Sequence, residues 1–169
     1  MMNYIKILFI GILILSWGGL ASSIEGELAK LYKDCLLPKE RIFLTKEQKE
    51  NIEKLSGVKL YSMLKIRYKN KCNNSSIYID SHIVRTLNQT LLLEVKNQSI
   101  HKMKTLHFME PLEYKSPIKW LKSFYTHKLN DKLKLNVDID GLSGATLTAT
   151  AVTNAGRKIL AIEQVLNEK

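Results

Sequence analysis

The sequence predicts an α+β domain, a twisted antiparallel sheet with packed helices, and two patterns support this fold class. Four stretches between residues 64 and 109 alternate apolar and polar side chains and are separated by short gaps. Short gaps favour antiparallel pairing, because parallel strands need long crossovers. Residues 148–166 repeat apolar side chains at the spacing of an amphipathic helix. In a chain of 169 residues we expect one domain at 24–169, with its core at about 77–166.

The first part of this domain is predicted to hold two helices and a strand. Residues 25–36 place apolar side chains on one stripe of a short helix, and residues 41–44 form a short strand. A second helix follows Thr45, because Thr45 and Gln48 make a capping box, in which each side chain binds the backbone N–H of the other residue. Gly57 lies just past the expected end of this helix, where glycine is common.

The strands of the sheet are expected at residues 64–68, 77–84, 91–96 and 100–109, with a hairpin turn at 96–99. The second of them has two distinct faces, because successive side chains of a strand point to opposite sides. One face carries Ile77, Ile79 and Ile83, and the other carries Tyr78, Asp80, His82 and Val84.

After the sheet, the chain is expected to return to helices. Pro117 suits the start of a short helix that carries Trp120, Leu121 and Phe124. Residues 137–140 read as another short extended piece. The closing helix has its buried face at Val152, Ala155, Ile159, Ile162 and Leu166.

Residues 1–23 have the pattern of an export signal. Lys6 precedes an uncharged apolar run at 7–20, and three small residues follow at 21–23. The run is shorter than the roughly 20 residues that a membrane-spanning helix needs. We expect a cleaved signal, with an uncleaved N-terminal anchor as the alternative. The domain is then periplasmic or otherwise extracytoplasmic, either free or held at the inner membrane by its N-terminus.

Charge and cysteine content argue against two classes of protein. The formal net charge is +10, but 22 of the 26 basic residues are Lys and only 4 are Arg, the side chain that binds phosphates and base edges in a bidentate manner. The lysines are spread along the chain, so we interpret them as a solvated surface and expect no nucleic-acid partner. Cys35 and Cys72 lack the spacing of a haem or zinc motif, which leaves one disulfide or two separate thiols.

The segment before the last helix has the features of an anion site. Gly141 and Gly144 let the backbone turn tightly and approach a ligand, while Ser143, Thr146 and Thr148 offer hydroxyls near a helix N-terminus. The segment is neither a Walker loop nor a GxGxxG fingerprint. On spacing alone, Thr146 or Thr148 could instead serve only as an N-cap of the helix.

A resemblance favours the functional interpretation. The segment Asp140-Gly141-Leu142-Ser143-Gly144-Ala145-Thr146-Leu147-Thr148 resembles the flavinylation motif of the FMN-binding domain family. That family includes the C subunit of sodium-translocating NADH:quinone reductase and the G subunit of the Rnf complex. In it, the Thr after Gly-Ala receives FMN through a phosphoester bond, and a dedicated flavin transferase installs the group from FAD outside the cytoplasm. That position is Thr146 here.

The likeness extends over roughly residues 77–162. Residues 80–86 and 108–114 are similar to segments of stand-alone members, whereas Ala149 stands where many members carry Ser. The resemblance implies that the cofactor contacts Asp140, Gly141, Ser143, Gly144, Ala145, Thr146, Leu147 and Thr148.

Residues outside the motif are further candidates, each with a simpler alternative. Trp120, together with Leu147, Met109 and Pro111, could wall a slot for the flavin ring, or Trp120 and Met109 could belong to the core. His82 could contact flavin or carry protons, or be a satisfied structural histidine. Glu110 could bond a flavin nitrogen, or be a loop carboxylate in water. Arg85 could pair with the FMN phosphate, or lie on the surface.

The resemblance implies a covalent flavoprotein that transfers electrons. No paired acid and base, catalytic triad or metal spacing accompanies the motif, so we expect an electron carrier more than an independent enzyme, with no catalytic and no metal-binding residues. Its expected partners are a flavin transferase and membrane or periplasmic redox proteins. The alternatives are a flavin-dependent reductase of a small substrate and a non-redox binding or sensor module.

Overall fold

The structure is a computed structural model that describes residues 24–130 and 132–168. The chain separates into two compact units, one ending at Lys33 and the other beginning at Asp34. The first unit holds α1 (Ile24–Leu31), which is shorter than the helix predicted at 25–36. The predicted export signal lies outside the described residues. Among the residues described, no helix is both long enough and apolar enough to cross a membrane.

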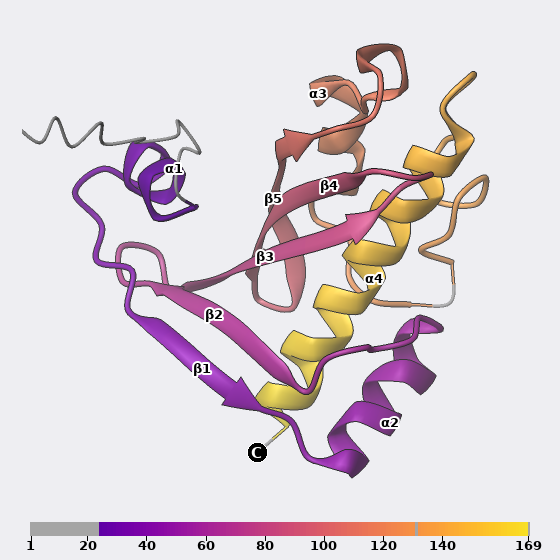
Figure 1. Cartoon of the computed structure of the whole chain (residues 1–169). Coiled ribbons are helices and arrows are strands. Elements are labelled where there is room, and N and C mark those ends of the chain that lie inside the picture. The colour runs from indigo at the N-terminus through magenta and orange to yellow at the C-terminus, as the bar shows by residue number, and fades with distance from the viewer. Residues whose placement is uncertain (1–23, 131, 169) are drawn as a thin grey trace, which may run out of the picture. The chain divides into compact units, whose positions relative to one another are not determined.

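The second unit is built on a five-stranded antiparallel sheet, in agreement with the predicted α+β class. The strands are ordered as they occur in the sequence, so each connection joins neighbours (Figure 1). The bounds are β1 (Lys39–Phe43), β2 (Leu64–Asn70), β3 (Ser75–Ile83), β4 (Asn88–Lys96) and β5 (Ser99–Phe108). The register places His82 opposite Gln89, and the chain turns back between β3 and β4 at residues 84–87.

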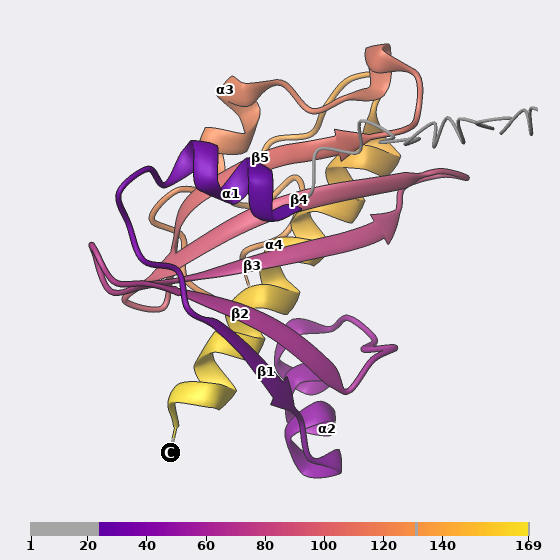
Figure 2. The same ribbon diagram turned by 60° about the vertical axis from the view of Figure 1, so that its left-hand side comes forward.

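One helix packs against a face of this sheet, and a second helix packs against the first. The long helix α4 (Thr146–Asn167) crosses the sheet diagonally, and α2 (Lys46–Ser56) lies alongside α4 on the β1 side (Figures 1 and 2). The capping box predicted for α2 is confirmed, because Thr45 Oγ1 accepts from Gln48 N at 3.1 Å and Gln48 Oε1 accepts from Thr45 N at 2.9 Å. Gly57 ends α2 with a φ of 70°, as expected for a C-terminal glycine.

The core lies between this face and α4. Its members include Tyr78 from β3, Leu91 and Leu93 from β4, and Ile159 and Ile162 from α4. The face of the strand that was predicted to carry Tyr78, Asp80 and His82 is therefore the one directed at α4, because Lys158 of α4 also contacts Asp80.

A segment of short turns connects β5 to α4. It contains η1 (Leu112–Tyr114), α3 (Ile118–Leu121), which starts after Pro117 as predicted, and η2 (Lys122–Phe124). The extended piece predicted at 137–140 is wrong, because the chain forms a tight turn there. Asn136 has a φ of 61° and its N–H donates to Ile139 O at 2.7 Å, so only an isolated bridge between residues 135 and 139 remains.

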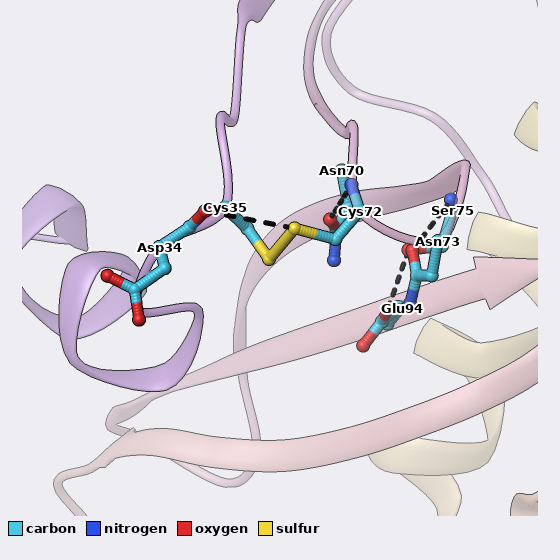
Figure 3. Close-up of a disulfide and its surroundings, with 7 residues drawn as sticks. All are labelled: Asp34, Cys35, Asn70, Cys72, Asn73, Ser75 and Glu94. Atoms are coloured by element: carbon cyan, nitrogen blue, oxygen red, sulfur yellow. Dashed lines mark hydrogen bonds between the residues drawn. A yellow bond between two sulfur atoms is a disulfide. The ribbon is translucent and has the colours of Figure 1, made fainter.

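The two cysteines form a disulfide near the turn between β2 and β3 (Figure 3). Cys35 and Cys72 have Cα atoms 5.6 Å apart and are separated by 37 positions in the sequence. The turn is held by Asn73 and Ser75, whose side chains donate to Glu94 of β4 at 2.9 and 2.6 Å. The bridge therefore joins the segment preceding β1 to a rigid hairpin.

Candidate functional site

The site begins at the tight turn that precedes α4. Leu142 O accepts from Ala145 N at 3.0 Å, and Gly144 has a φ of 77°, the combination of a type II turn. A side chain at Gly144 would meet nothing within 4 Å, so the demand for glycine here comes from the backbone conformation and not from crowding. Gly141 is different, because a Cβ there would lie 2.8 Å from Asn136 Oδ1.

Thr146 is the first residue of α4, and its hydroxyl does not cap the helix. The N-cap position belongs to Ala145, which has no side-chain oxygen, so the N-cap alternative for Thr146 is excluded. Thr148 is already inside the first turn and is buried. Thr146 is exposed, and within the described residues its hydroxyl has no hydrogen-bond partner. The hydroxyl of Thr146, in the first turn of α4, is therefore available for covalent attachment of a cofactor.

The backbone around Thr146 suits an anion. The first helical bond of α4 runs from Ala149 N to Ala145 O at 3.0 Å, so the N–H groups of residues 146–148 have no acceptor within the helix. The positive end of the helix dipole acts at the same place. These donors, together with the hydroxyl of Thr146, match the oxygens of a phosphate group.

A pocket of about 220 Å³ opens at this helix terminus. Three segments line it: Val84 and Arg85 from the β3–β4 turn, Glu110 and Tyr114 from the segment after β5, and residues 144–148 from the start of α4. The predicted candidates Thr146, Leu147, Glu110 and Arg85 are therefore brought together. Arg85 adds a positive charge that complements a phosphate.

Glu110 has a structural task in this pocket. Its Oε1 accepts from the backbone N–H groups of Thr86 at 2.7 Å, Leu87 at 2.8 Å and Arg85 at 3.2 Å. The hydrogen bond from Thr86 N, followed by that from Leu87 N, lowers the pKa of the Glu110 carboxyl, outweighing the effect of burial. Glu110 thus holds the β3–β4 turn against the end of β5, where Arg85 reaches the pocket.

Trp120 supports the motif from the core instead of lining the pocket. It is buried, and its ring makes an edge-on contact with Phe124 at 5.1 Å between centroids. Its Nε1 donates to Asp140 O at 2.8 Å, which ties the first residue of the motif to α3. Met109 and Pro111 do not line the pocket either, and Met109 is half-exposed. Of the four residues proposed for a slot, only Leu147 faces the cavity.

Arg157 connects α4 to two other segments of the chain, a role that no sequence pattern predicted. This buried side chain of α4 donates from Nε to Ser56 O at 2.7 Å, and from Nη1 to Asn130 O and Leu133 O, both at 2.9 Å. It therefore caps the end of α2 and holds the chain that leads into the motif. The only sequence signal was a charged residue next to the apolar stripe of α4, which is equally typical of a solvated position.

A larger groove of about 660 Å³ lies next to the pocket and shares Val84 and Leu147 with it. His82, Asp80 and Lys158 line this groove, together with the first turns of α4. Its size is in the range of pockets that hold one small organic ligand. His82 thus lies in a groove that adjoins the pocket of Thr146, although the two residues are 64 positions apart in the sequence. Lys158 was not among the predicted residues.

The residues present fit a phosphorylated flavin. The hydroxyl of the exposed Thr146, open space at Gly144 and a set of free backbone donors form an attachment point, and the adjoining groove has the volume for a ring system. One buried polar atom beside that groove, His82 Nε2, has no hydrogen-bond partner among residues 24–130 and 132–168. In the part of the chain described, no cluster of three or more His, Cys, Asp or Glu side chains is arranged to bind a metal ion.

Comparison with known proteins identifies the same region. Residues 86–161 match the model of a family described as the FMN-binding domain. The matched range includes the segment after β5, the tight turn and most of α4, whereas Asp80 and His82 precede it. No curated protein and no solved structure matches the chain.

Proposed function

We propose, on the premise that this chain belongs to the FMN-binding domain family, that it is an extracytoplasmic electron-transfer protein with FMN attached covalently to Thr146. The observation that carries the proposal is the state of Thr146. Thr146 is exposed, its hydroxyl has no partner in the described structure, and it lies at a helix N-terminus that opens into a pocket. The other hydroxyl of this first helical turn, on Thr148, is buried.

Attachment by a flavin transferase would balance as follows. The Thr146 Oγ attacks the phosphorus of the FMN half of FAD, a new phosphoester bond forms, and the pyrophosphate bond to AMP breaks. AMP leaves with the electron pair of that bond, and the hydroxyl proton passes to solvent. Free N–H groups at the start of α4 and the Arg85 guanidinium would stabilise the negative charge on the transferred phosphate.

Once attached, the isoalloxazine ring supplies the redox chemistry, and the protein supplies position and environment. Leu147 offers an apolar contact shared by pocket and groove, while Glu110 keeps Arg85 at the pocket through the β3–β4 turn. A covalent bond suits a protein working outside the cytoplasm, because a dissociated cofactor would be lost to the medium. The disulfide supports that location, since such bridges persist in oxidising compartments.

The test is the intact mass of the exported protein after co-expression with a flavin transferase. We expect a gain equal to FMN minus water in the wild type and in Thr150→Ala, and no gain in Thr146→Ala. Thr150 is the matched control, because it is an exposed threonine one helical turn further along α4. The starting residue of the mature chain also reports whether the signal is cleaved. An unmodified wild-type mass would overturn the covalent assignment.

The groove favours a second candidate, a flavin-dependent reductase of a small substrate. If the ring is held in the 220 Å³ pocket, the adjoining 660 Å³ groove is left for a substrate. In a reductase, a small acceptor would reoxidise the reduced flavin at a rate that saturates with acceptor concentration. Tyr61→Ala or Asn154→Ala in the groove wall would raise the KM for that acceptor. A carrier would instead be reoxidised at a rate that rises linearly with acceptor concentration.

A further inference from the structure

Three polar side chains form a continuous chain between α4 and β3. Lys158 Nζ lies 2.6 Å from Asp80 Oδ1, and His82 Nδ1 lies 2.9 Å from Asp80 Oδ2. The side chains of all three are 10–16% exposed. Each oxygen of Asp80 therefore has its own partner, and the position of the imidazole depends on a carboxylate that is itself held by a lysine.

This arrangement determines the state of the two ring nitrogens of His82. Because a carboxylate only accepts, Nδ1 carries the hydrogen, and Nε2 is an acceptor in the neutral ring. The pKa of Asp80 supports the carboxylate form: burial raises it, but the hydrogen bond from His82 and the charge of Lys158 outweigh burial and lower it. Nε2 is buried and has no hydrogen-bond partner in the described structure.

The imidazole belongs to the same cleft as the attachment site. His82, Asp80 and Lys158 line the 660 Å³ groove, which meets the pocket of Thr146 at Val84 and Leu147. Reduction of a flavin tethered at Thr146 would therefore add negative charge close to His82 Nε2, the ring nitrogen without a hydrogen-bond partner in the described structure. This step rests on the proposed function.

We propose that His82 is a redox-linked proton site, with Asp80 and Lys158 as positioning residues. When two electrons arrive from a reduced redox partner, negative charge is added beside the groove, and His82 takes one proton from water on Nε2. The ring becomes an imidazolium that carries a hydrogen on both nitrogens. On reoxidation the electrons pass to an acceptor protein and the proton returns to water, so charge and atoms balance over the cycle.

The charges around His82 explain why its protonation would follow the redox state. Asp80 favours the imidazolium, whereas Lys158 of α4 opposes it. Two further cations also oppose it: Lys65 of β2, which interacts with Asp80, and Lys59 after α2, which lines the groove. The effect of neighbouring positive charges is evident at Lys65. Burial lowers the pKa of Lys65 most, the charge of Lys158 lowers it further, and the charge of Asp80 acts in the opposite direction. On β4, the residue opposite His82 is the neutral Gln89, and the neutral Asn88 lines the groove. Tyr61 is the remaining titratable group among the residues that line the groove. Negative charge arriving near this excess of cations would favour uptake of a proton.

The experiment is a spectroelectrochemical titration of the flavin midpoint potential against pH, on protein whose FMN attachment has been verified by mass. A proton taken up with two electrons changes the potential by about 30 mV per pH unit. We expect His82→Gln to lose up to this much slope across the range near neutral pH in which histidine titrates. The matched control is His101→Gln, an exposed histidine on β5, which should keep the wild-type slope.

Asp80→Asn provides a second variant with a different signature. The Asn side chain keeps an acceptor for His82 Nδ1–H but lacks the negative charge of Asp80. The pH range in which the midpoint potential changes more steeply with pH should therefore move to lower pH instead of vanishing. A purely structural Asp80 would leave the pH profile where it is. A flavinylated His82→Gln with the wild-type slope overturns the proton site alone. An unmodified wild-type mass overturns this inference together with the function on which it rests.

Discussion

At the scale of single residues, the carboxylate of Glu110 illustrates how one side chain can shape a pocket that it also lines. All four hydrogen bonds that the structure assigns to this carboxylate end on Oε1, three of them from consecutive backbone N–H groups of the β3–β4 turn. These bonds hold the conformation of the turn at residues 84–87. Its shape, and with it the place of Arg85, depends on a residue that follows β5.

The depressed pKa of Glu110 predicts a pH-dependent contribution to stability. The pKa of Glu110 is lower in the folded than in the unfolded protein. Its contribution to the free energy of unfolding is therefore complete above the ordinary pKa of Glu, about 4.3, and is lost as pH falls through the folded pKa. Glu110→Gln should therefore lower the melting temperature at neutral pH and flatten its dependence on pH in the acidic range. The measurement is thermal unfolding as a function of pH. Glu113→Gln, on the exposed η1 segment, should keep the wild-type curve; a parallel shift of both variants would contradict the assignment.

At the scale of elements, the start of α4 is distinguished from an ordinary helix start by what it lacks. Most helices begin with a side chain that binds the free N–H groups. Here Ala145 occupies that position, and Gly144 places the preceding chain in a turn that leaves the helix end open. An uncapped N-terminus is less stable by about 1 kcal/mol, and the open donors are then available to a ligand.

The conformation of Gly144 can be tested separately from the stability it confers. Gly144→Ala should lower the free energy of unfolding by about 1 kcal/mol, because a residue with a Cβ is strained at positive φ. It should also slow FMN attachment, since Thr146 follows the turn. Gly57→Ala is the matched control: Gly57 has a φ of 70° and equally open surroundings, but lies after α2. Equal attachment rates in the two variants would show that the turn does not present Thr146.

At the scale of the whole second unit, the site is assembled from distant segments. The pocket joins the β3–β4 turn, the segment after β5 and the start of α4, and Arg157 connects α4 to Ser56, 101 positions away. Such contacts form only after the sheet and α4 have packed. We therefore expect the site to be sensitive to global stability.

The disulfide should contribute strongly to that stability. Closing a loop with a sequence separation of 37 limits the unfolded chain, and loop-entropy estimates for this length give about 4 kcal/mol. Urea unfolding with and without reductant should therefore show a lower midpoint for the reduced protein. The double variant Cys35→Ser/Cys72→Ser should unfold like the reduced wild type and should not respond to reductant. Unchanged midpoints in both comparisons would contradict a stabilising bridge.

The local patterns predicted much of this architecture because each depends on neighbouring residues. Alternation predicted four of the five sheet strands within a few residues of their ends, and the pair Thr45 and Gln48 predicted the start of α2. The turn at residues 137–140 was missed because Asn136 adopts a left-handed conformation that short apolar runs do not reveal. The motif also predicted that Thr146 lies near the N-terminus of the last helix, since the glycines and hydroxyls are adjacent in the chain.

By itself, then, the sequence determined the order and type of the main strands and helices and the glycine-containing turn before Thr146, because these follow from spacing along the chain. Only the tertiary structure decided that Glu110 binds the β3–β4 turn, that Trp120 supports the loop from the core, and that Lys158 holds Asp80 against His82. These contacts link residues that are up to 78 positions apart. Their partners depend on strand register and on the angle at which α4 crosses the sheet, and neither is encoded in any local pattern.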